Sequence, residues 1–130
     1  MAYLIDKMDD INKLSGNVIH SAIVVHKILG PGFMEEVYQN ALAIQLGKDG
    51  IKFEEKVVID VRFHEYDVGR YILDFLVDDR IILELKTVKE INDNHLAQTL
   101  SYLKATRKKL GLILNFSKRI LEIKRVVNKI

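Results

Sequence analysis

The segment YILDFLVDDRIILELK, residues 71–86, decides how the rest of the sequence is interpreted. Its two apolar runs, 71–77 and 81–86, are typical of β-strands, and the polar residues between them predict a hairpin turn. Asp74 and Glu84 each interrupt one of these runs. A carboxylate in an apolar strand costs free energy unless it is paired or bound to a cation, so both acids are candidates for a functional site.

The register of this hairpin determines whether the two acids meet. With a two-residue loop, Val77 pairs with Arg80 and the acids point to opposite faces of the sheet. With a three-residue loop, Val77 pairs with Ile81 and the acids lie opposite each other. The sequence leaves both registers open. In the second register Lys86, which shares a strand face with Glu84, would join the two carboxylates.

A cluster of Asp74, Glu84 and Lys86 suits the hydrolysis of a phosphodiester bond. Two adjacent carboxylates repel each other and call for a divalent cation, Mg²⁺ or Mn²⁺, which polarises a phosphate and lowers the pKa of a bound water. The lysine could position that water or stabilise charge in the pentavalent state. The alternative is a structural ion pair between Lys86 and one of the acids.

The sequence around the hairpin predicts a mixed sheet with helices packed against it. The elements expected before the hairpin are a helix capped by Ser15 or Asn17 and running to Leu29, a Gly30-Pro31-Gly32 turn, a helix over about 34–49, a strand over 56–63 and a turn over 66–69. Those expected after it are a helix over about 94–108 capped by Asn92, Asp93 or Asn94 and ended by Gly111, a strand over 112–114, and an ambiguous strand or helix over 120–127. The inward residues of the helices are predicted to be Val18, Ala22, Val25, Leu29, Val37, Ala41, Ile44, Leu96, Leu100 and Leu103.

The amino-acid composition excludes several kinds of functional site. The 130 residues include no cysteine and four histidines without a metal-ligand spacing, which excludes disulfides, thiolate zinc sites and cysteine nucleophiles. Oxygen ligands remain, and they favour Mg²⁺ or Mn²⁺ over zinc. The acidic first ten residues and the lack of a long apolar run predict a cytoplasmic protein. The length predicts one domain over 14–130, after a loosely held leader at 1–13.

The net charge of +2 hides an asymmetry along the chain. Residues 1–65 carry a net charge of −3 and residues 66–130 one of +5, and 104–130 holds nine basic residues against Glu122 alone. A basic cluster suits a polyanion such as nucleic acid, although a solvated basic face without a partner has the same composition. The candidate nucleic-acid-binding residues are Lys104, Arg107, Lys108, Lys109, Lys118 and Arg119.

Three further residues could belong to the same site. Gln98 and Tyr102 are four residues apart and share a helix face, where an amide and a hydroxyl could bind a water, a carboxylate or a phosphate. Glu35 lies in the first turn of the second helix, which the helix dipole favours on structural grounds alone, and it is also a candidate third carboxylate. His26 is expected to satisfy a core hydrogen bond.

The order of these motifs resembles a known family. Gly32-x-x-Glu35-x-x-Tyr38 is similar to the motif of the GxxExxY protein family. Asp74 followed by Glu84-x-Lys86 resembles the core of the PD-(D/E)XK nuclease superfamily, and Gln98-x-x-x-Tyr102 resembles the QxxxY motif of RecB-like nucleases. The resemblance covers about residues 14–127 and includes the segment 111–116. The residue before Asp74 is leucine where the motif has proline.

The resemblance implies a restriction-endonuclease-like α-β-β-β-α-β core with an extra N-terminal helix. It implies metal ligation by Asp74 and Glu84, with the Leu85 carbonyl as a further ligand and Glu35 as the helix-borne acid. It also implies that Lys86 is the catalytic lysine, with Gln98 and Tyr102 in supporting positions.

The sequence thus predicts a metal-dependent nuclease acting on DNA. A chain of this size has no room for a separate target-reading domain, so selectivity for ends or structures, a homodimer or a larger partner is expected. The alternative is a nucleic-acid-binding or protein-interaction module that keeps the fold without turnover. A nucleotide hydrolase ranks lower because the chain lacks a Walker-type glycine loop.

Overall fold

The computed structural model describes the backbone of residues 2–129 and the side chains of residues 10–129. The elements along the chain are α1 (Ala2–Leu29), α2 (Glu35–Lys48), β1 (Phe53–Phe63), β2 (Tyr66–Val77), β3 (Ile81–Lys86), α3 (Asp93–Thr106), β4 (Leu110–Asn115) and β5 (Glu122–Val127). The mixed α/β class and the element order predicted from the sequence are confirmed, and the ambiguous 120–127 segment is a strand.

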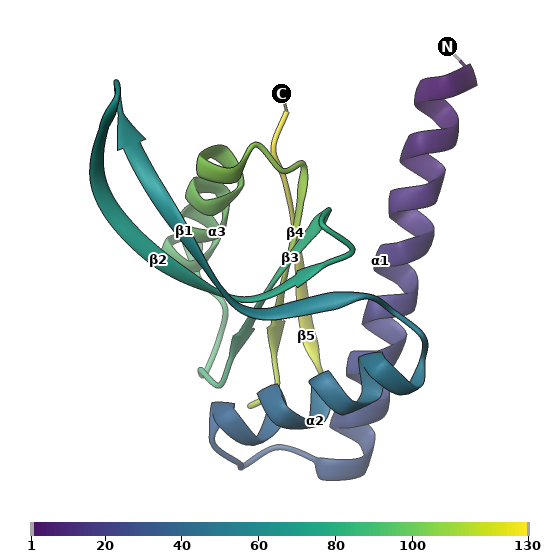
Figure 1. Ribbon diagram of the computed structural model, residues 1–130. Coiled ribbons are helices and arrows are strands. Elements are labelled where there is room, and N and C mark those ends of the chain that lie inside the picture. The colour runs from purple at the N-terminus through teal and green to yellow at the C-terminus, as the bar shows by residue number, and fades with distance from the viewer. Residues whose placement is uncertain (1, 130) are drawn as a thin grey trace.

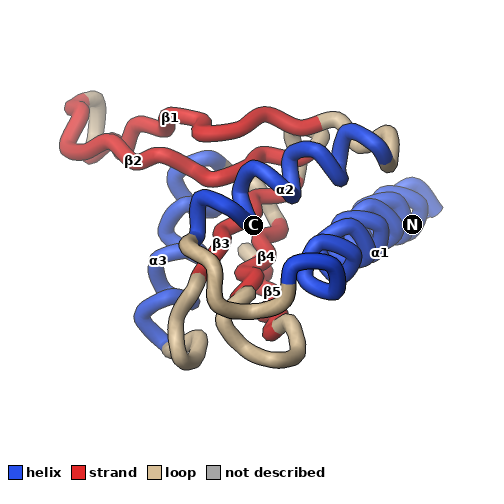
Figure 2. The backbone as a smooth tube through the Cα atoms, turned by 90° about the horizontal axis from the view of Figure 1, so that it is seen from below, coloured by secondary structure: helices blue, strands red, loops and turns tan. Residues whose placement is uncertain are grey.

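The five strands form one sheet in the order β1-β2-β3-β4-β5. All neighbouring pairs are antiparallel except β3 and β4, which are parallel and are joined through α3. In Figure 1 the long β1–β2 hairpin extends beyond the other strands at the upper left. Seen from below in Figure 2, α3 lies on one side of β3–β5 and α1 lies on the other.

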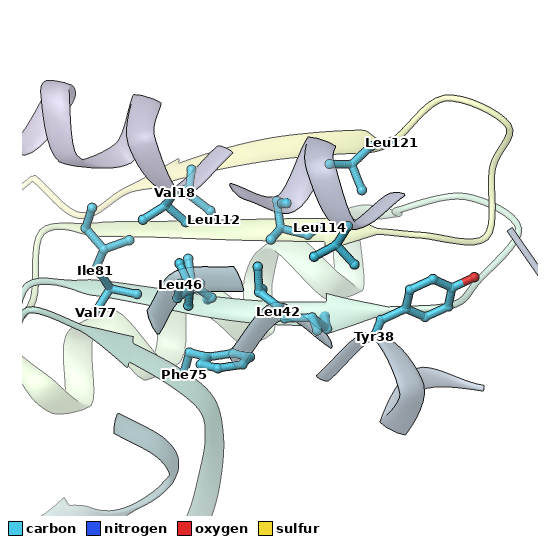
Figure 3. Close-up of a cluster of buried hydrophobic side chains, with 14 of the residues drawn as sticks. Val18, Tyr38, Leu42, Leu46, Phe75, Val77, Ile81, Leu112, Leu114 and Leu121 are labelled. Atoms are coloured by element: carbon cyan, nitrogen blue, oxygen red, sulfur yellow. The ribbon is translucent and has the colours of Figure 1, made fainter. Parts of the chain in front are cut away.

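The sheet has a hydrophobic core on each face. Helices α1 and α2 cover one face with side chains such as Val18, Leu42 and Leu46, which pack on Phe75 and Leu112 (Figure 3). Helix α3 covers the other face. The buried residues of this second core are Ile59, Leu73, Leu76, Ile82, Ile91, Tyr102, Leu103, Ile113 and Val126.

Strand β2 changes face in the middle of its length. Phe75 belongs to the core under α1 and α2, whereas Leu73, only two residues away, belongs to the core under α3. Alternate residues of a regular strand share a face, so the strand must twist sharply at Asp74 between them. Asp74 of β2 and Lys56, which lies opposite it on β1, are not paired in the ladder, although the residues on both sides of them are. Lys56 has a left-handed φ of 52°.

The predicted inward face of α2 is wrong by one position. Val37 and Ile44 are exposed and Ala41 is half-buried. The residues that follow Val37 and Ala41, namely Tyr38 and Leu42, are fully buried together with Leu46. These larger residues recur every four positions and fill the space between α1 and the sheet. The tyrosine ring also stacks on Phe116, with ring centroids 4.6 Å apart.

Helix α1 begins well before the predicted cap. Its backbone is helical from Ala2, so neither Ser15 nor Asn17 caps it, and the Ser15 hydroxyl instead donates to the carbonyl of Asn12 within the helix. Ile11 and Leu14 extend the apolar stripe and pack against the core, which explains why the helix continues upstream. The backbone of 2–13 is therefore helical rather than loosely held; residue 1 of the predicted leader lies outside the described residues.

Two predicted turns also differ. Residues 66–69 belong to β2, and the hairpin turns at His64 and Glu65, where His64 has a φ of 56°. Helix α3 ends at Thr106 because Arg107 adopts a left-handed conformation, not because of Gly111. Gly111 lies inside β4, where an added Cβ would stand 2.8 Å from the Cγ2 of Thr99. The glycine thus allows α3 to pack closely on the sheet.

Candidate metal and catalytic centre

The β2–β3 hairpin adopts the register that brings the two acids together. Val77 pairs with Ile81, as the three-residue loop requires, and regular backbone pairing stops after Phe75 and Leu83. Beyond that point the side chains replace the backbone ladder. The backbone N–H of Asp74 donates to Oε2 of Glu84 at 2.9 Å. The two-residue alternative is therefore excluded.

A second hydrogen bond between β2 and β3 involves the carboxylate of Asp74. The N–H of Leu85 donates to Oδ2 of Asp74 at 2.8 Å, so each carboxyl group accepts from the backbone of the opposite strand. This reciprocal pair fixes both carboxylates in the notch where β2 and β3 separate. The two acids reach this place because β2 twists at Asp74 and leaves its neighbour.

Burial raises the pKa of both acids. The Glu84 side chain is 5% exposed, and its burial followed by the charge of Asp74 raises its pKa to about 8, against the lowering effect of the Asp74 N–H and of Lys86. Burial also raises the pKa of Asp74, although the Leu85 N–H and then the charge of Lys86 lower it. Removing carboxylates from water is costly, and a nearby cation would offset that cost.

Lys86 and Gln98 lie together on the α3 side of the centre. Lys86 follows Glu84 on the same face of β3, and its Nζ lies 3.5 Å from Oε1 of Gln98 on α3. Lys86 is half-buried and Gln98 is exposed, so the ammonium group stands at the boundary between the acids and solvent. The structure thus brings together the lysine and the glutamine that the sequence predicted.

Tyr102 stands deeper in the same region. Its side chain is only 6% exposed, and burial, with the negative charge of Glu84 next in importance, raises its pKa to about 12. Its ring lies beside the exposed ring of Tyr71 on β2, with centroids 5.3 Å apart. Tyr102 therefore remains a neutral hydrogen-bonding group throughout the physiological range of pH.

Glu35 approaches Asp74 from the other side of the sheet. It occupies the first turn of α2, where loss of surrounding water and then the charge of Asp74 raise its pKa, while Lys86 lowers it. The two acids line a shallow hollow of about 320 Å³ together with Glu36, Gln39 and Lys56. Glu35 itself is exposed, so it forms the rim of this hollow rather than its floor.

The tyrosine of the GxxExxY motif has a structural role that positions Glu35. The Tyr38 hydroxyl donates to the carbonyl of Gly30 at 2.6 Å and accepts from the N–H of Phe33 at 3.2 Å. The two bonds hold the turn in which Gly30 and Gly32 have left-handed φ values of 70° and 115°. This turn sets where α2 begins and therefore where Glu35 stands.

His26, in the last turn of α1, contacts the connection between β4 and β5. As expected from the sequence it is buried and satisfied by a hydrogen bond, with its Nε2 2.8 Å from the carbonyl oxygen of Lys118. The end of α1 is thereby joined to the segment that follows β4.

Three residues that line the hollow were not predicted from the sequence, namely Glu36, Gln39 and Lys56. The amide of Gln39 is 6% exposed, and its Nε2 donates to the Asp74 carbonyl and to Oε1 of Glu55, both at 3.1 Å. The available signal was its position one turn after Glu35, on the same face of the helix. Lys56 had no such signal, because its place opposite Asp74 depends on the twist of the hairpin.

The predicted nucleic-acid-binding residues divide between the two ends of the sheet. Lys104, Arg107, Lys108 and Lys109 surround the end of α3, and Lys108 forms an ion pair with Asp79 in the β2–β3 turn at 3.1 Å. That turn lies at the start of β3, whereas Lys86 lies at its end. The other two predicted residues, at 118–119, follow β4, whose last residue pairs with Lys86.

The donor set fits a hard divalent cation bound by few protein ligands. Within the described side chains, no three acids or histidines form a group able to hold a metal ion. Two carboxylates, Asp74 and Glu84, do converge, and Mg²⁺ usually takes one or two carboxylates while the rest of its shell comes from water and substrate. Two buried carboxylates side by side are costly when both are ionised, and a bound cation would offset that cost.

Comparisons with known proteins identify the family and the fold of this chain. No curated protein matches the sequence. The crystal structure of SSO0001 is similar in fold, with a TM-score of 0.58 and 13% sequence identity over 74% of this chain. The chain spans about half of SSO0001, 51% of its length. None of the helices in the described part of the chain is long and apolar enough to cross a membrane. The family model of the PD-(D/E)XK nuclease superfamily matches residues 12–126, nearly the whole sequence, and the chain therefore belongs to that superfamily.

Proposed function

We propose that this protein is a divalent-metal-dependent nuclease that hydrolyses phosphodiester bonds in DNA. The observation that carries the proposal is the pair of reciprocal hydrogen bonds through which Asp74 and Glu84 occupy the notch between β2 and β3, with Lys86 beside them. The superfamily consists generally of nucleases, which agrees with this assignment. The proposed catalytic domain covers residues 14–130.

Asp74 and Glu84 would hold Mg²⁺ or Mn²⁺, with the Leu85 carbonyl as a further ligand and Glu35 as an acid on the rim. The bound cation would polarise the scissile phosphate and lower the pKa of its water. Binding requires ionised carboxylates, so Glu84 would release its proton when the site is filled. The hydrogen bonds to the backbone keep both groups oriented before the substrate arrives.

Lys86 would act on the substrate directly. Its ammonium group can donate to the attacking water or to a phosphoryl oxygen, where negative charge increases in the transition state. Gln98, whose Oε1 lies 3.5 Å from Nζ, limits the directions that the lysine can take. Tyr102 on α3 would remain neutral and could donate a hydrogen bond to the acid cluster from that side of the sheet.

The substrate proposed is DNA with an accessible end or an irregular structure. The described residues form a single sheet with three helices, and the acids lie near the end of β3, where its pairing with β2 stops. Within residues 10–129 no separate module for reading a long base sequence accompanies this sheet. A homodimer or a larger partner would supply any further selectivity.

The test is cleavage by the purified protein in Mg²⁺ or Mn²⁺, using labelled single-stranded, duplex and branched DNA, and RNA. Glu84→Ala and Lys86→Ala should each abolish cleavage, because they remove a metal ligand and the charge-stabilising group. Lys48→Ala, an exposed lysine in the last turn of α2, is the matched control and should retain activity. Equal inactivity of the wild type and both variants on every substrate, RNA included, contradicts the proposal.

The alternative is a binding module that keeps the fold without turnover. The observation compatible with it is that, among the described side chains, no three acids or histidines form a group able to hold a metal ion. Calorimetry separates the two functions. A nuclease should bind Mn²⁺ with an affinity that Asp74→Ala and Glu84→Ala remove, whereas a binding module should show no such dependence.

A further inference from the structure

Lys56 has a backbone conformation that its side chain does not favour. It lies within β1, yet its φ of 52° places it in the left-handed region, which is unfavourable for a residue with a Cβ. The β1–β2 register runs from Glu55 paired with Phe75 directly to Val57 paired with Leu73, so Lys56 and Asp74 are not paired in the ladder. Strain of this kind persists where the surrounding structure enforces it, and it is concentrated at functional sites.

The distorted strand places Lys56 beside Asp74. Lys56 lines the hollow that also contains Asp74, Glu35 and Gln39, and its side chain is exposed. Its charge acts on Asp74, as the charge of Lys86 does. Because β2 lies between β1 and β3, the two lysines approach Asp74 from opposite neighbouring strands.

The ammonium group of Lys56 is not engaged by the acids around it. Within the part of the chain whose side chains the structure describes, no carboxylate lies within 4.0 Å of its Nζ, although Glu35, Glu36 and Asp74 line the same hollow. Glycine adopts a positive φ without a steric penalty, so the bend itself does not require a lysine at this position. This ammonium group beside Asp74 is what the bend adds to the hollow.

We propose that Lys56 is a second cationic residue of the substrate site, which binds a backbone phosphate of DNA next to the scissile phosphate, across Asp74 from Lys86. A compact ammonium on a flexible stem suits a phosphate oxygen as a point-charge contact. The inference rests on the proposed function for the location of the substrate. It goes beyond that function in giving the hollow on the α2 side a phosphate-binding role.

The test compares two glycine substitutions that relieve the same kind of strain. Lys56→Gly removes the ammonium and relaxes the backbone, while His64→Gly relaxes the exposed residue with a φ of 56° in the hairpin turn. Each variant is measured for its melting temperature and for its binding to fluorescein-labelled DNA in Ca²⁺, over a series of salt concentrations. Lys56→Gln, which removes the charge but keeps the strain, completes the set.

We expect Lys56→Gly and Lys56→Gln to weaken DNA binding roughly tenfold or more, as the loss of a charge-assisted hydrogen bond does. The slope of log affinity against log salt should decrease by about 0.7–0.9, the value for one phosphate contact. The melting temperature of Lys56→Gly should stay the same or rise. His64→Gly should leave both affinity and slope unchanged.

The outcomes separate this inference from the proposed function. Unchanged affinity and salt slope in both Lys56 variants overturn the inference, as does a wild-type protein that binds no DNA. If binding depends on Lys56 but the wild type never cleaves, the phosphate contact stands and the nuclease proposal fails. If cleavage occurs and Lys56 does not affect binding, the nuclease proposal stands alone.

Discussion

Glu84 shows how one buried carboxyl couples stability to function. It is 5% exposed, lies beside a second carboxylate, and has a pKa raised to about 8 mainly by burial. Without a cation the folded protein therefore binds a proton at Glu84 more tightly than the unfolded chain does. By linkage, the penalty for ionising this group is absent at low pH and grows as the pH rises from about 4.5 to about 8.

The metal-free protein should accordingly lose stability as the pH rises from 5 to 8. The raised pKa of Asp74 contributes with the same sign. Glu84→Gln removes the titration and keeps an oxygen that can accept from the Asp74 N–H, so it should stabilise the protein at pH 8 by on the order of a few kcal/mol. The gain should shrink towards pH 5. Urea unfolding in EDTA at several pH values measures both effects.

Divalent metal should reverse this dependence. Mn²⁺ binds ionised carboxylates, so its stabilising effect on the wild type should increase with pH and should be lost in Glu84→Gln. Glu65→Gln, at the exposed hairpin turn, is the matched control and should leave the pH profile unchanged. A wild-type stability that does not vary between pH 5 and 8 in EDTA contradicts the argument.

Tyr38 makes a separate prediction about the turn before α2. Tyr38→Phe keeps the ring and its stacking but leaves the Gly30 carbonyl and the Phe33 N–H without their partner. The free energy of unfolding should fall by about 0.5–1.5 kcal/mol, the net contribution of a hydrogen bond, because Gly30 and Phe33 are not fully buried and water can reach them. Tyr66→Phe, on an exposed side chain of β2, should change it by less than about 0.5 kcal/mol in the same urea titration.

Helix α3 owes its position to a glycine on the strand beneath it. An alanine Cβ at Gly111 would stand 2.8 Å from Cγ2 of Thr99, which is itself 1% exposed. Gly111→Ala should therefore cost about 1–3 kcal/mol of stability, as overpacking does. It should also displace α3 and with it Gln98, so activity should fall together with stability.

A double-mutant cycle checks whether the contact between residues 99 and 111 causes this loss of stability. Thr99→Ser removes the clashing methyl group, so it should restore most of the stability lost in Gly111→Ala. Gly16→Ala is the control for glycine replacement in general. Its Cβ would meet nothing within 4 Å inside α1, so the change should stabilise the protein by about 0.5–1 kcal/mol. An additive effect of the two substitutions at 99 and 111 contradicts the packing argument.

The elements differ in how far the sequence could predict them. Strands β2 and β3 and the stripe of α3 followed from apolar periodicity, since Leu103 is buried and Leu96 and Leu100 pack against the same core. The hairpin register did not follow, because two loop lengths fit Asp78-Asp79-Arg80 equally well. The buried face of α2 was misplaced because its apolar residues fall on several faces, and packing on Phe116 selects among them.

The candidate site was predicted where it depends on one strand or one helix. Glu84 and Lys86 share a face by strand alternation, and Gln98 and Tyr102 share one by helix periodicity. The contribution of Lys56 depends on the twist of β2 at Asp74, which arises from packing against two different cores. Such a twist is a property of the whole sheet, so a local pattern does not reveal it.

Considered as a whole, the molecule concentrates its chemistry at one end of a sheet that has a core on each face. The acids and Lys86 stand at the end of β3, beside the first turn of α2 and the connection between β4 and β5. Four of the six predicted nucleic-acid-binding residues lie at the opposite end, around the end of α3. DNA bound at the acid centre should therefore contact the basic residues unequally.

Charge reversal at two exposed positions tests this asymmetry. Arg119→Glu and Lys109→Glu make the same change in net charge, but Arg119 lies in the connection after β4, at the end of the sheet that contains Lys86, and Lys109 lies at the far end. Exposed charges more than about 10 Å apart are largely screened at 0.1 M salt, so the nearer substitution should dominate. Arg119→Glu should weaken binding of labelled DNA in Ca²⁺ several-fold more than Lys109→Glu does. Equal losses would indicate that the DNA extends along the whole sheet, and a larger loss at Lys109 would place its main contact away from the acid centre.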